Sequence, residues 1–368
     1  MLTNPPAMGS KSIHHFSVIR LRLILGTLLA TAVLFPSIYQ PFISSTYKYL
    51  NASAIYRTST FETFWTVFWY AAIEVPMTVA FFNHSEWRLA HQEGSRTQAK
   101  PIRREATDYT DSMSSIVANS TLPRPRGMRR PSRRIGEIML YMAPLLALDL
   151  FMIKKFADVA LEDMLLSGNY DPSEVLSSQN ISTRRSSHFL LPSVHRITWS
   201  SPLQTTRALP VHAPSSRRIT LELLTSFFIY DTVFFLFHLA LHRLPSLARW
   251  HAPHHTHGEI HPQVTNQLSV FERLGLVLLA NFSLNIIKSH VLTRTLFVPV
   301  FVWLLVELHC GLDVPWGLDK ILPKGWAGGP RKHARHHDGG HGGLEPFFNW
   351  WDAALECVEG RGQRVKAA

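Results

Sequence analysis

Long apolar runs alternate with polar stretches along this chain of 368 residues. Each run approaches the roughly 20 residues that an α-helix needs to cross the hydrocarbon core of a bilayer. The pattern therefore predicts an all-α fold, a polytopic bundle of helices integral to a membrane. The six runs cover residues 18–39, 63–82, 136–156, 219–242, 269–287 and 293–309.

Two polar stretches separate these runs. Residues 83–135 are rich in Ser, Thr, Pro and Arg, and residues 157–216 are rich in Ser and Arg, so neither is expected to bury a core. We interpret both as linkers. The predicted organisation has N-terminal transmembrane segments at 1–82, a basic linker at 83–135, a transmembrane segment at 136–156, a loop at 157–216, a C-terminal domain at 217–360 and a tail at 361–368.

The formal net charge of +11 bears on topology rather than on nucleic acid, because no nucleic-acid-binding motif accompanies it. Much of the basic charge lies in residues 83–135, which the positive-inside rule predicts to be cytosolic. Alternation of the spans then places both termini in the cytosol. The triplets at Asn51 and Asn180 fall in predicted lumenal loops, as glycosylation would require.

Histidine is the unusual component of the chain, since 13 of its 20 histidines lie at or beyond position 238. Three motifs hold most of them: "HLALH" at 238–242, "HAPHH" at 251–255 and "HARHH" at 333–337. Spacings of three and four place side chains on one face of a helix, where they can chelate a metal. The eight candidate ligands are His238, His242, His251, His254, His255, His333, His336 and His337.

Eight imidazoles exceed what a single zinc ion uses, so two metals are implied. His254 and His255 are expected to point in slightly different directions, which also suits two neighbouring ions. The two cysteines, Cys310 and Cys357, form no CxxC pair, which excludes disulfide scaffolds, thiolate zinc sites and c-type haem. A nitrogen-rich dinuclear site beside a membrane favours redox iron over structural zinc.

Other residues near the boxes are weaker candidates. His309 ends the sixth apolar run at the depth of the boxes and is a further possible ligand, while His257, His261 and His341 flank boxes. Acidic residues inside apolar runs are functional candidates by default. Asp231, seven residues before His238, and Glu307, near His309, could orient ligating imidazoles, although a structural hydrogen bond is an equally good explanation for each.

The ordered HxxxH, HxxHH and HxxHH boxes resemble those of the fatty acid hydroxylase and sterol desaturase superfamily of membrane di-iron oxygenases. "LHCGLDVPW" at 308–316 looks like the stretch ahead of the last box in sterol 4-methyl oxidases, and "FFNWWD" at 347–352 looks like their closing segment. The resemblance covers about residues 217–360 and implies that this domain is catalytic. Leu305 stands where some relatives have a further histidine.

The resemblance implies two irons held by the box histidines, O2 as co-substrate, and electrons from a separate NAD(P)H and cytochrome b5-type chain. The expected reaction is hydroxylation or desaturation of a membrane lipid at an unactivated C–H bond. The substrate is expected to be a sterol, with a fatty-acyl or sphingolipid hydroxylase as the alternative. A histidine-rich metal transporter and an inactive scaffold are the competing functions of another class.

Three further expectations concern partners and location. Aromatic residues of the last three apolar runs, Phe234, Phe235, Phe237, Phe301 and Trp303, are expected to line the substrate path. The basic linker could dock an acidic electron donor such as cytochrome b5. The tail "RVKAA" resembles a retrieval signal, so an endoplasmic reticulum membrane with the metal site facing the cytosol is expected.

Overall fold

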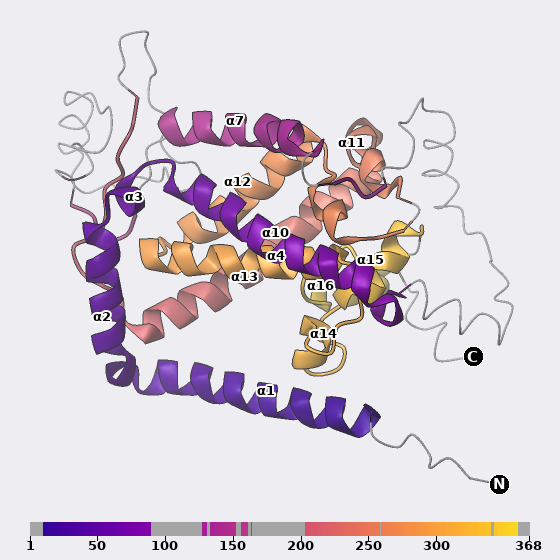
Figure 1. Ribbon diagram of the computed structural model, residues 1–368, viewed down its shortest axis with the longest axis horizontal. Coiled ribbons are helices and arrows are strands. Elements are labelled where there is room, and N and C mark those ends of the chain that lie inside the picture. The colour runs from indigo at the N-terminus through magenta and orange to yellow at the C-terminus, as the bar shows by residue number, and fades with distance from the viewer. Residues whose placement is uncertain are drawn as a thin grey trace, which may run out of the picture.

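The computed structural model describes residues 10–89, 127–130, 133–151, 156–160, 163, 203–257, 259–339 and 342–359 (Figure 1). They form helices joined by turns, so the predicted all-α class is confirmed. The helices are α1 (Ser10–Leu34), α2 (Pro36–Ala52), α3 (Ala54–Arg57), α4 (Phe61–Asn83), α7 (Ile135–Phe151), α10 (Ser216–Arg243), α11 (Pro245–His251), α12 (Val270–Ile286), α13 (Val291–His309), α14 (Leu318–Ile321), α15 (Gly329–His337) and α16 (Trp350–Val358). Short 3₁₀ turns cover Ser85–Trp87, Ala252–His255 and Pro262–Asn266.

Three of these helices are long and apolar enough to cross a membrane: α4, α10 and α13. A fourth crossing is possible if the bent pair of α1 and α2 counts as one broken span. Within the described residues α7 and α12 have 17 residues each. At about 1.5 Å per residue such a helix reaches roughly 26 Å, short of a core of about 30 Å. The expectation of six full-length spans is therefore met by three of the runs.

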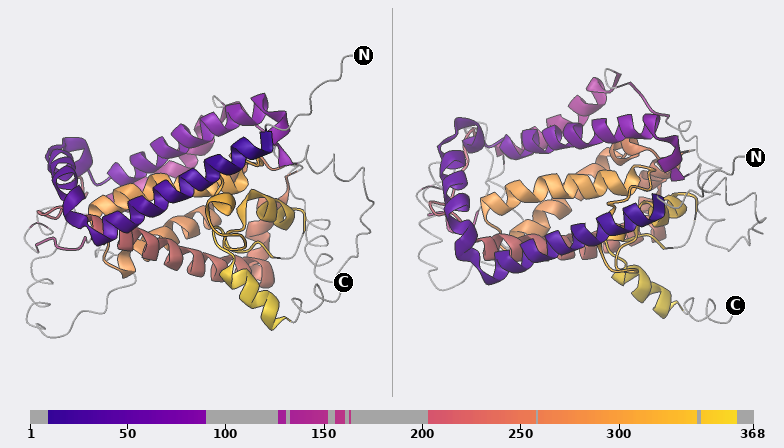
Figure 2. Two further views of the ribbon diagram at one scale, coloured as in Figure 1. Left: turned by 90° about the horizontal axis from the view of Figure 1, so that it is seen from below. Right: turned by 60° about the horizontal axis from the view of Figure 1, so that its bottom comes forward.

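The first apolar run was predicted to be one helix, and this prediction is wrong. The chain bends by 89° between α1 and α2. Pro36 is the first residue of α2, and Phe35 before it has φ −126° and ψ 60°, outside the helical region. A residue preceding proline is sterically driven out of the α conformation, which accounts for the bend. As a result α2 lies across one end of the bundle (Figures 1 and 2).

The core of the bundle forms where α13 packs between α4 and α10, with α12 against α10 (Figures 1 and 2). Its centre is an aromatic cluster in which Tyr230 contacts Phe301 and Phe347, and Phe227 stacks on Phe297. Aromatic side chains bury large apolar areas, so such a cluster fixes how the helices sit against each other. This packing brings the C-terminal ends of α10 and α13 to the same end of the molecule.

At the opposite end, residues 203–215 depart from the prediction that 157–216 buries no core. The Arg207 side chain is fully buried, and its guanidinium stacks on the Tyr56 ring and pairs with Glu62 at 3.0 Å. Glu62 also pairs with Arg294 of α13 at 3.2 Å. A buried charge requires such partners. Nothing in the Ser-rich sequence around this arginine indicated that they exist.

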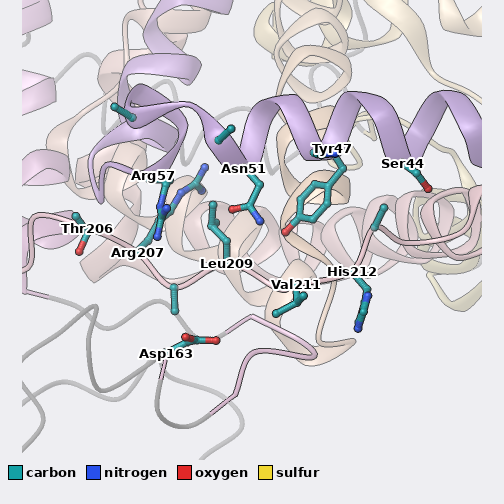
Figure 3. Close-up of a pocket in the computed structure, with 15 residues that line it drawn as sticks. Ser44, Tyr47, Asn51, Arg57, Asp163, Thr206, Arg207, Leu209, Val211 and His212 are labelled. Atoms are coloured by element: carbon teal, nitrogen blue, oxygen red, sulfur yellow. The ribbon is translucent and has the colours of Figure 1, made fainter.

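The same end holds a depression of about 950 Å³ between α2, α3 and residues 206–213 (Figure 3). Tyr47, Asn51, Arg57 and His212 are among its lining residues. None of the box histidines lines it. The histidines lie at the other end of the bundle, so this depression is not part of the site described next.

Candidate metal centre

Five elements bring the predicted histidines together at one end of the bundle (Figure 1). The first box ends α10, and the second spans the end of α11 and the 3₁₀ turn that follows it. The third box lies on the short helix α15, and His309 is the last residue of α13. Boxes from separate parts of the chain therefore converge because the α10 and α13 helices end at the same level.

The nine histidines form two groups, within each of which one nitrogen per residue lies within 4.8 Å of all the others. We call them group A and group B. His254 and His255 belong to different groups, as two neighbouring ions would require. Group A contains His238, His242, His251, His255 and His336, and group B contains His254, His309, His333 and His337.

The separations between nitrogens suit metal ligands better than hydrogen-bonded pairs. In group A, His251 Nε2 lies 3.0, 3.0 and 2.8 Å from the Nε2 atoms of His238, His242 and His255. One nitrogen carries at most one proton, so it cannot satisfy three such neighbours by hydrogen bonding. Imidazoles bound to one ion at about 2.1 Å and at right angles have nitrogens about 3.0 Å apart. The donor set therefore fits a metal ion.

Group B shows the same geometry. His333 Nε2 lies 2.9 Å from His309 Nε2 and 3.0 Å from His337 Nε2. Three of its members, His254, His309 and His333, are buried, and His337 is half-buried. In group A, His242 and His255 are half-buried. The two groups thus have similar donors, and each has at least one member that is partly open to solvent.

Electrostatics keep the histidines of the second and third boxes neutral. Burial, with the neighbouring imidazoles, lowers the pKa of each of them, that of His255 to about 3 and those of His254 and His337 well below the ordinary value. At pH 7 these rings therefore carry a free lone pair. Neutral imidazole is the form that binds a metal.

Outer hydrogen bonds set which nitrogen faces the cluster. His238 Nδ1 donates to the Leu344 carbonyl at 2.9 Å, and His309 Nδ1 donates to the Leu305 carbonyl at 2.9 Å. In both rings Nδ1 must then carry the proton, so Nε2 presents a lone pair inward. Leu305 thus contributes through its backbone carbonyl.

Glu272 is a site residue that the sequence reasoning missed. Its Oε1 lies 2.5 Å from His251 Nδ1, and both side chains are 3% exposed. Its Oε2 accepts from the Ser269 backbone N–H at 3.1 Å, completing a capping box at the start of α12. The Ser-x-x-Glu pattern at 269–272 predicts a helix start, and it could have located this carboxylate.

Asp231 and Glu307 accept hydrogen bonds from backbone N–H groups rather than from ligating imidazoles, which favours the structural alternative of the two interpretations. Asp231 Oδ1 accepts from the backbone N–H groups of Phe347 at 2.9 Å and Phe348 at 3.2 Å. The Glu307 carboxylate accepts from the Leu318 N–H at 3.3 and 3.4 Å. Glu307 and His309 are two residues apart on a helix, and side chains at that spacing point in different directions.

The closing motif "FFNWWD" connects the first box to the third. Asp352 accepts from the Leu344 N–H at 3.1 Å, and the carbonyl of the same Leu344 holds His238. Lys332, beside the third box, donates to Asp352 at 2.7 Å and to Asn349 at 2.6 Å. The motif therefore has a structural basis in this chain: it fixes two boxes relative to each other.

The motif "HCGLDVPW" supports the third box from the other side. Asp313 accepts from Arg331 of α15 at 2.6 Å and pairs with Lys320. Gly311 has φ +67°, and a Cβ there would lie 2.0 Å from the Ile260 carbonyl oxygen. Only glycine adopts this backbone at so close an approach without strain.

The weaker candidates have mixed outcomes. His257 is half-buried, with its ring 6.3 Å from that of His254, and His261 is buried; neither belongs to group A or B. His341 lies outside the described residues.

The five aromatic residues expected to line one path belong to different clusters. Phe234 and Phe301 pack in the central aromatic cluster, and Trp303 packs against α4. Phe235 stacks near Trp351, and Phe237 lies beside Phe271. The prediction of one shared lining is wrong, because these residues fall on different faces of α10 and α13.

Comparison with known proteins gives matches within the C-terminal half. Residues 223–356 match the fatty acid hydroxylase family. Cholesterol 25-hydroxylase of Rattus norvegicus is 34% identical over 148 residues, which are 40% of this chain and 50% of the relative. The Homo sapiens protein of that name is 32% identical over 148 residues, which are 40% of this chain and 54% of the relative. A methylsterol monooxygenase of Aspergillus fumigatus is 29% identical over 161 residues, 42% of this chain and 52% of the relative.

The chain thus spans about half the length of the curated relatives it matches. No solved structure matches it. The matched region contains all nine histidines of groups A and B, together with Glu272 and both supporting motifs. The resemblance indicated by the three boxes is therefore confirmed, since residues 223–356 match the fatty acid hydroxylase family.

Proposed function

We propose that this protein is an O2-dependent di-iron oxidoreductase that hydroxylates or desaturates a membrane lipid, with a sterol as the favoured substrate class. The observation that carries the proposal is the convergence of nine imidazole nitrogens into two metal-sized groups, inside the segment that matches the fatty acid hydroxylase family. Groups A and B would each hold one iron. Bound iron supplies the one-electron and O2 chemistry that no protein side chain provides.

The protein's own part is to hold and orient the ligating imidazoles and to shield them from water. Three of the inward nitrogens are fixed by outer bonds, from His238 to Leu344, His309 to Leu305 and His251 to Glu272. The buried aromatic cluster on α10 and α13 excludes water on the bundle side of the histidines. Hydroxylation would consume a C–H bond, O2, two electrons and two protons, and would yield C–OH and water.

A sterol substrate is favoured over a fatty-acyl or sphingolipid substrate by the relatives. Proteins named cholesterol 25-hydroxylase and methylsterol monooxygenase align across the histidine boxes. Both names denote a sterol substrate. We therefore propose the class of substrate and leave the oxidised carbon to experiment.

A metal transporter is the competing function, and the position of the histidines argues against it. Transporters place ion ligands near the middle of the membrane, where substrate passes between two sides. Here the first box and His309 end their helices, and the second and third boxes lie on short elements beyond those helices. An inactive scaffold is disfavoured because every box position is filled.

We further propose an endoplasmic reticulum location with the histidine end in the cytosol and an electron donor of the cytochrome b5 type. Arg129 and Arg130 are exposed. The Arg129 backbone is bonded to the side chain of Gln263, eight residues after the second box, and its guanidinium forms an ion pair with Glu137. Arg124 and Arg126 lie outside the described residues. If neutralising these four arginines left the rate of reduction and its salt dependence unchanged, the donor does not dock there.

The decisive experiment compares lipids in a sterol-containing host that expresses either the wild type or the His254→Ala/His255→Ala variant. This variant removes one ligand from each group. We expect a sterol that gains one oxygen, or loses two hydrogens, only with the wild type. An equal lipid profile from both proteins, at equal expression, would contradict the proposal. A change confined to acyl lipids would keep the oxygenase and replace the substrate class.

A further inference from the structure

We propose that Glu272 is a positioning residue that selectively secures the metal of group A by holding His251. This inference rests on the proposed function, because it assumes that group A binds a metal. It adds a carboxylate from α12, a helix that contributes no histidine to the boxes. Glu272 is not within reach of the metal position itself in this arrangement, since His251 lies between the carboxylate and the other nitrogens of group A.

His251 is the hub of group A. Its Nε2 is the atom that lies within 3.0 Å of three other ligand nitrogens, those of His238, His242 and His255. Its position therefore affects the distances to most of the group at once. A small rotation of this ring would disturb group A more than the same rotation of a peripheral ligand.

Glu272 is built to fix that ring. Its Oε1 bonds His251 Nδ1, while its Oε2 accepts from both the N–H and the hydroxyl of Ser269, at 3.1 and 3.0 Å. The backbone N–H of Glu272 in turn donates to the Ser269 hydroxyl at 3.2 Å. These bonds tie the carboxylate to the first turn of α12, so it has little freedom to follow a moving imidazole.

The chemistry of the pair favours metal binding at Nε2. A carboxylate oxygen accepts, so Nδ1 of His251 carries the proton and Nε2 keeps its lone pair. The negative charge also makes the imidazole a stronger donor, and loss of such an outer partner typically weakens metal affinity by about 10- to 100-fold. The effect should be confined to group A, because His251 is not a member of group B.

Glu272→Gln is the informative substitution because an amide cannot replace both acceptors. If its oxygen faces Ser269, its NH2 faces His251 and demands that Nδ1 accept, which moves the ring proton to the metal-facing Nε2. If its oxygen faces His251, the NH2 opposes the Ser269 N–H. Either orientation loses the hydrogen bonding at one of the two carboxylate oxygens, while the size of the side chain is preserved.

Glu307→Gln is the matched control. Glu307 and Glu272 are each 2% exposed, and Glu307 also lies close to a cluster histidine in the chain. Its carboxylate, however, accepts from the Leu318 backbone N–H. A single amide oxygen can still accept that bond, so this substitution should leave both metals in place.

The experiment is an anaerobic Fe²⁺ titration of the purified full-length chain in nanodiscs, with bound iron measured by mass spectrometry and a competing chelator setting the free concentration. The set is the wild type, Glu272→Gln, Glu307→Gln, His251→Ala and the His251→Ala/Glu272→Gln double variant. We expect two equivalents for the wild type and Glu307→Gln. For Glu272→Gln we expect one equivalent unchanged and the other bound about 10- to 100-fold more weakly.

The double variant tests the route of the effect. If Glu272 acts through His251, adding Glu272→Gln to His251→Ala should cause no further loss, whereas independent effects would add. Two unchanged equivalents in Glu272→Gln would overturn the inference. Equal weakening of both equivalents would also overturn it, because a general disturbance of the fold would then explain the result. A wild type that binds fewer than two irons would instead contradict the proposed function.

Discussion

The two hydrogen bonds that Asp231 accepts from backbone N–H groups predict that this side chain stabilises the fold, a role distinct from that of a metal ligand. Asp231 lies on α10 with no exposed surface, and its Oδ1 accepts from Phe347 and Phe348. These residues follow Leu344, whose carbonyl holds His238. We expect Asp231→Ala to loosen the 344–348 segment and, through it, the first box.

The magnitude follows from the two donors left without an acceptor. A buried N–H that loses its partner costs about 1–3 kcal/mol, so two of them cost roughly 2–6 kcal/mol. For a protein of this size 1 kcal/mol corresponds to a shift of about 2 °C or more in the unfolding midpoint. The expected fall in the midpoint is therefore about 4–12 °C. Asp231→Asn keeps an acceptor oxygen and should shift the midpoint far less.

The assay is thermal unfolding of metal-free protein in detergent, followed by loss of the monodisperse peak in size-exclusion chromatography. Leu236→Ala is a suitable control, because Leu236 lies on the same helix and is 58% exposed. The reasoning is refuted if Asp231→Ala unfolds at the wild-type temperature, or if Asp231→Asn is as unstable as Asp231→Ala. The second outcome would mean that charge, not the acceptor geometry, is what matters.

Three further predictions concern the backbone, the buried ion pair and pH. Gly311→Ala should prevent recovery of folded protein, because its Cβ would overlap a carbonyl oxygen 2.0 Å away, whereas Gly26→Ala, with nothing within 4 Å, should be neutral in the same size-exclusion assay. Arg207→Met should destabilise the fold by about 3–5 kcal/mol because it breaks a buried pair, while Arg57→Met, at an exposed position, should stay within about 0.5 kcal/mol in thermal unfolding. Burial lowers the pKa of the second- and third-box histidines, so the unfolded chain binds protons first as pH falls. Metal-free protein should therefore lose stability below about pH 6.5, by up to about 1.4 kcal/mol per pH unit for each histidine. A variant with three of these histidines changed to Gln should show a shallower pH dependence of the unfolding midpoint.

What the sequence predicted well depends on side-chain pattern. Apolar runs located the helices, and the three- and four-residue spacings located eight histidines that the structure does bring together. The bend before Pro36 was visible in the sequence and overlooked, and so was the capping box at Ser269 and Glu272. Both are local signals, and an interpretation based on the apolar pattern alone does not use them.

What could not be predicted depends on backbone atoms and on distant parts of the chain. The acceptors for His238 and His309 are carbonyls of Leu344 and Leu305, and any residue type supplies a carbonyl. Nor does an Asp seven residues before a His reveal that it bonds two N–H groups more than 110 positions away. Arg207 looked like part of a linker because its partners, Tyr56 and Glu62, lie on α3 and α4, about 150 positions away.

These contacts indicate why metal binding and folding should be coupled at this end of the bundle. Buried ring nitrogens such as His254 Nδ1 and His336 Nε2 have no hydrogen-bond partner among the described residues. Such atoms are costly to bury, and a cluster of neutral imidazoles adds to that cost. A metal that binds only the folded arrangement stabilises it by an amount that grows with occupancy. The bonds from Asp231, Asp352 and Glu272 hold the nitrogens close enough for binding, and the metal in turn offsets the cost of burying them.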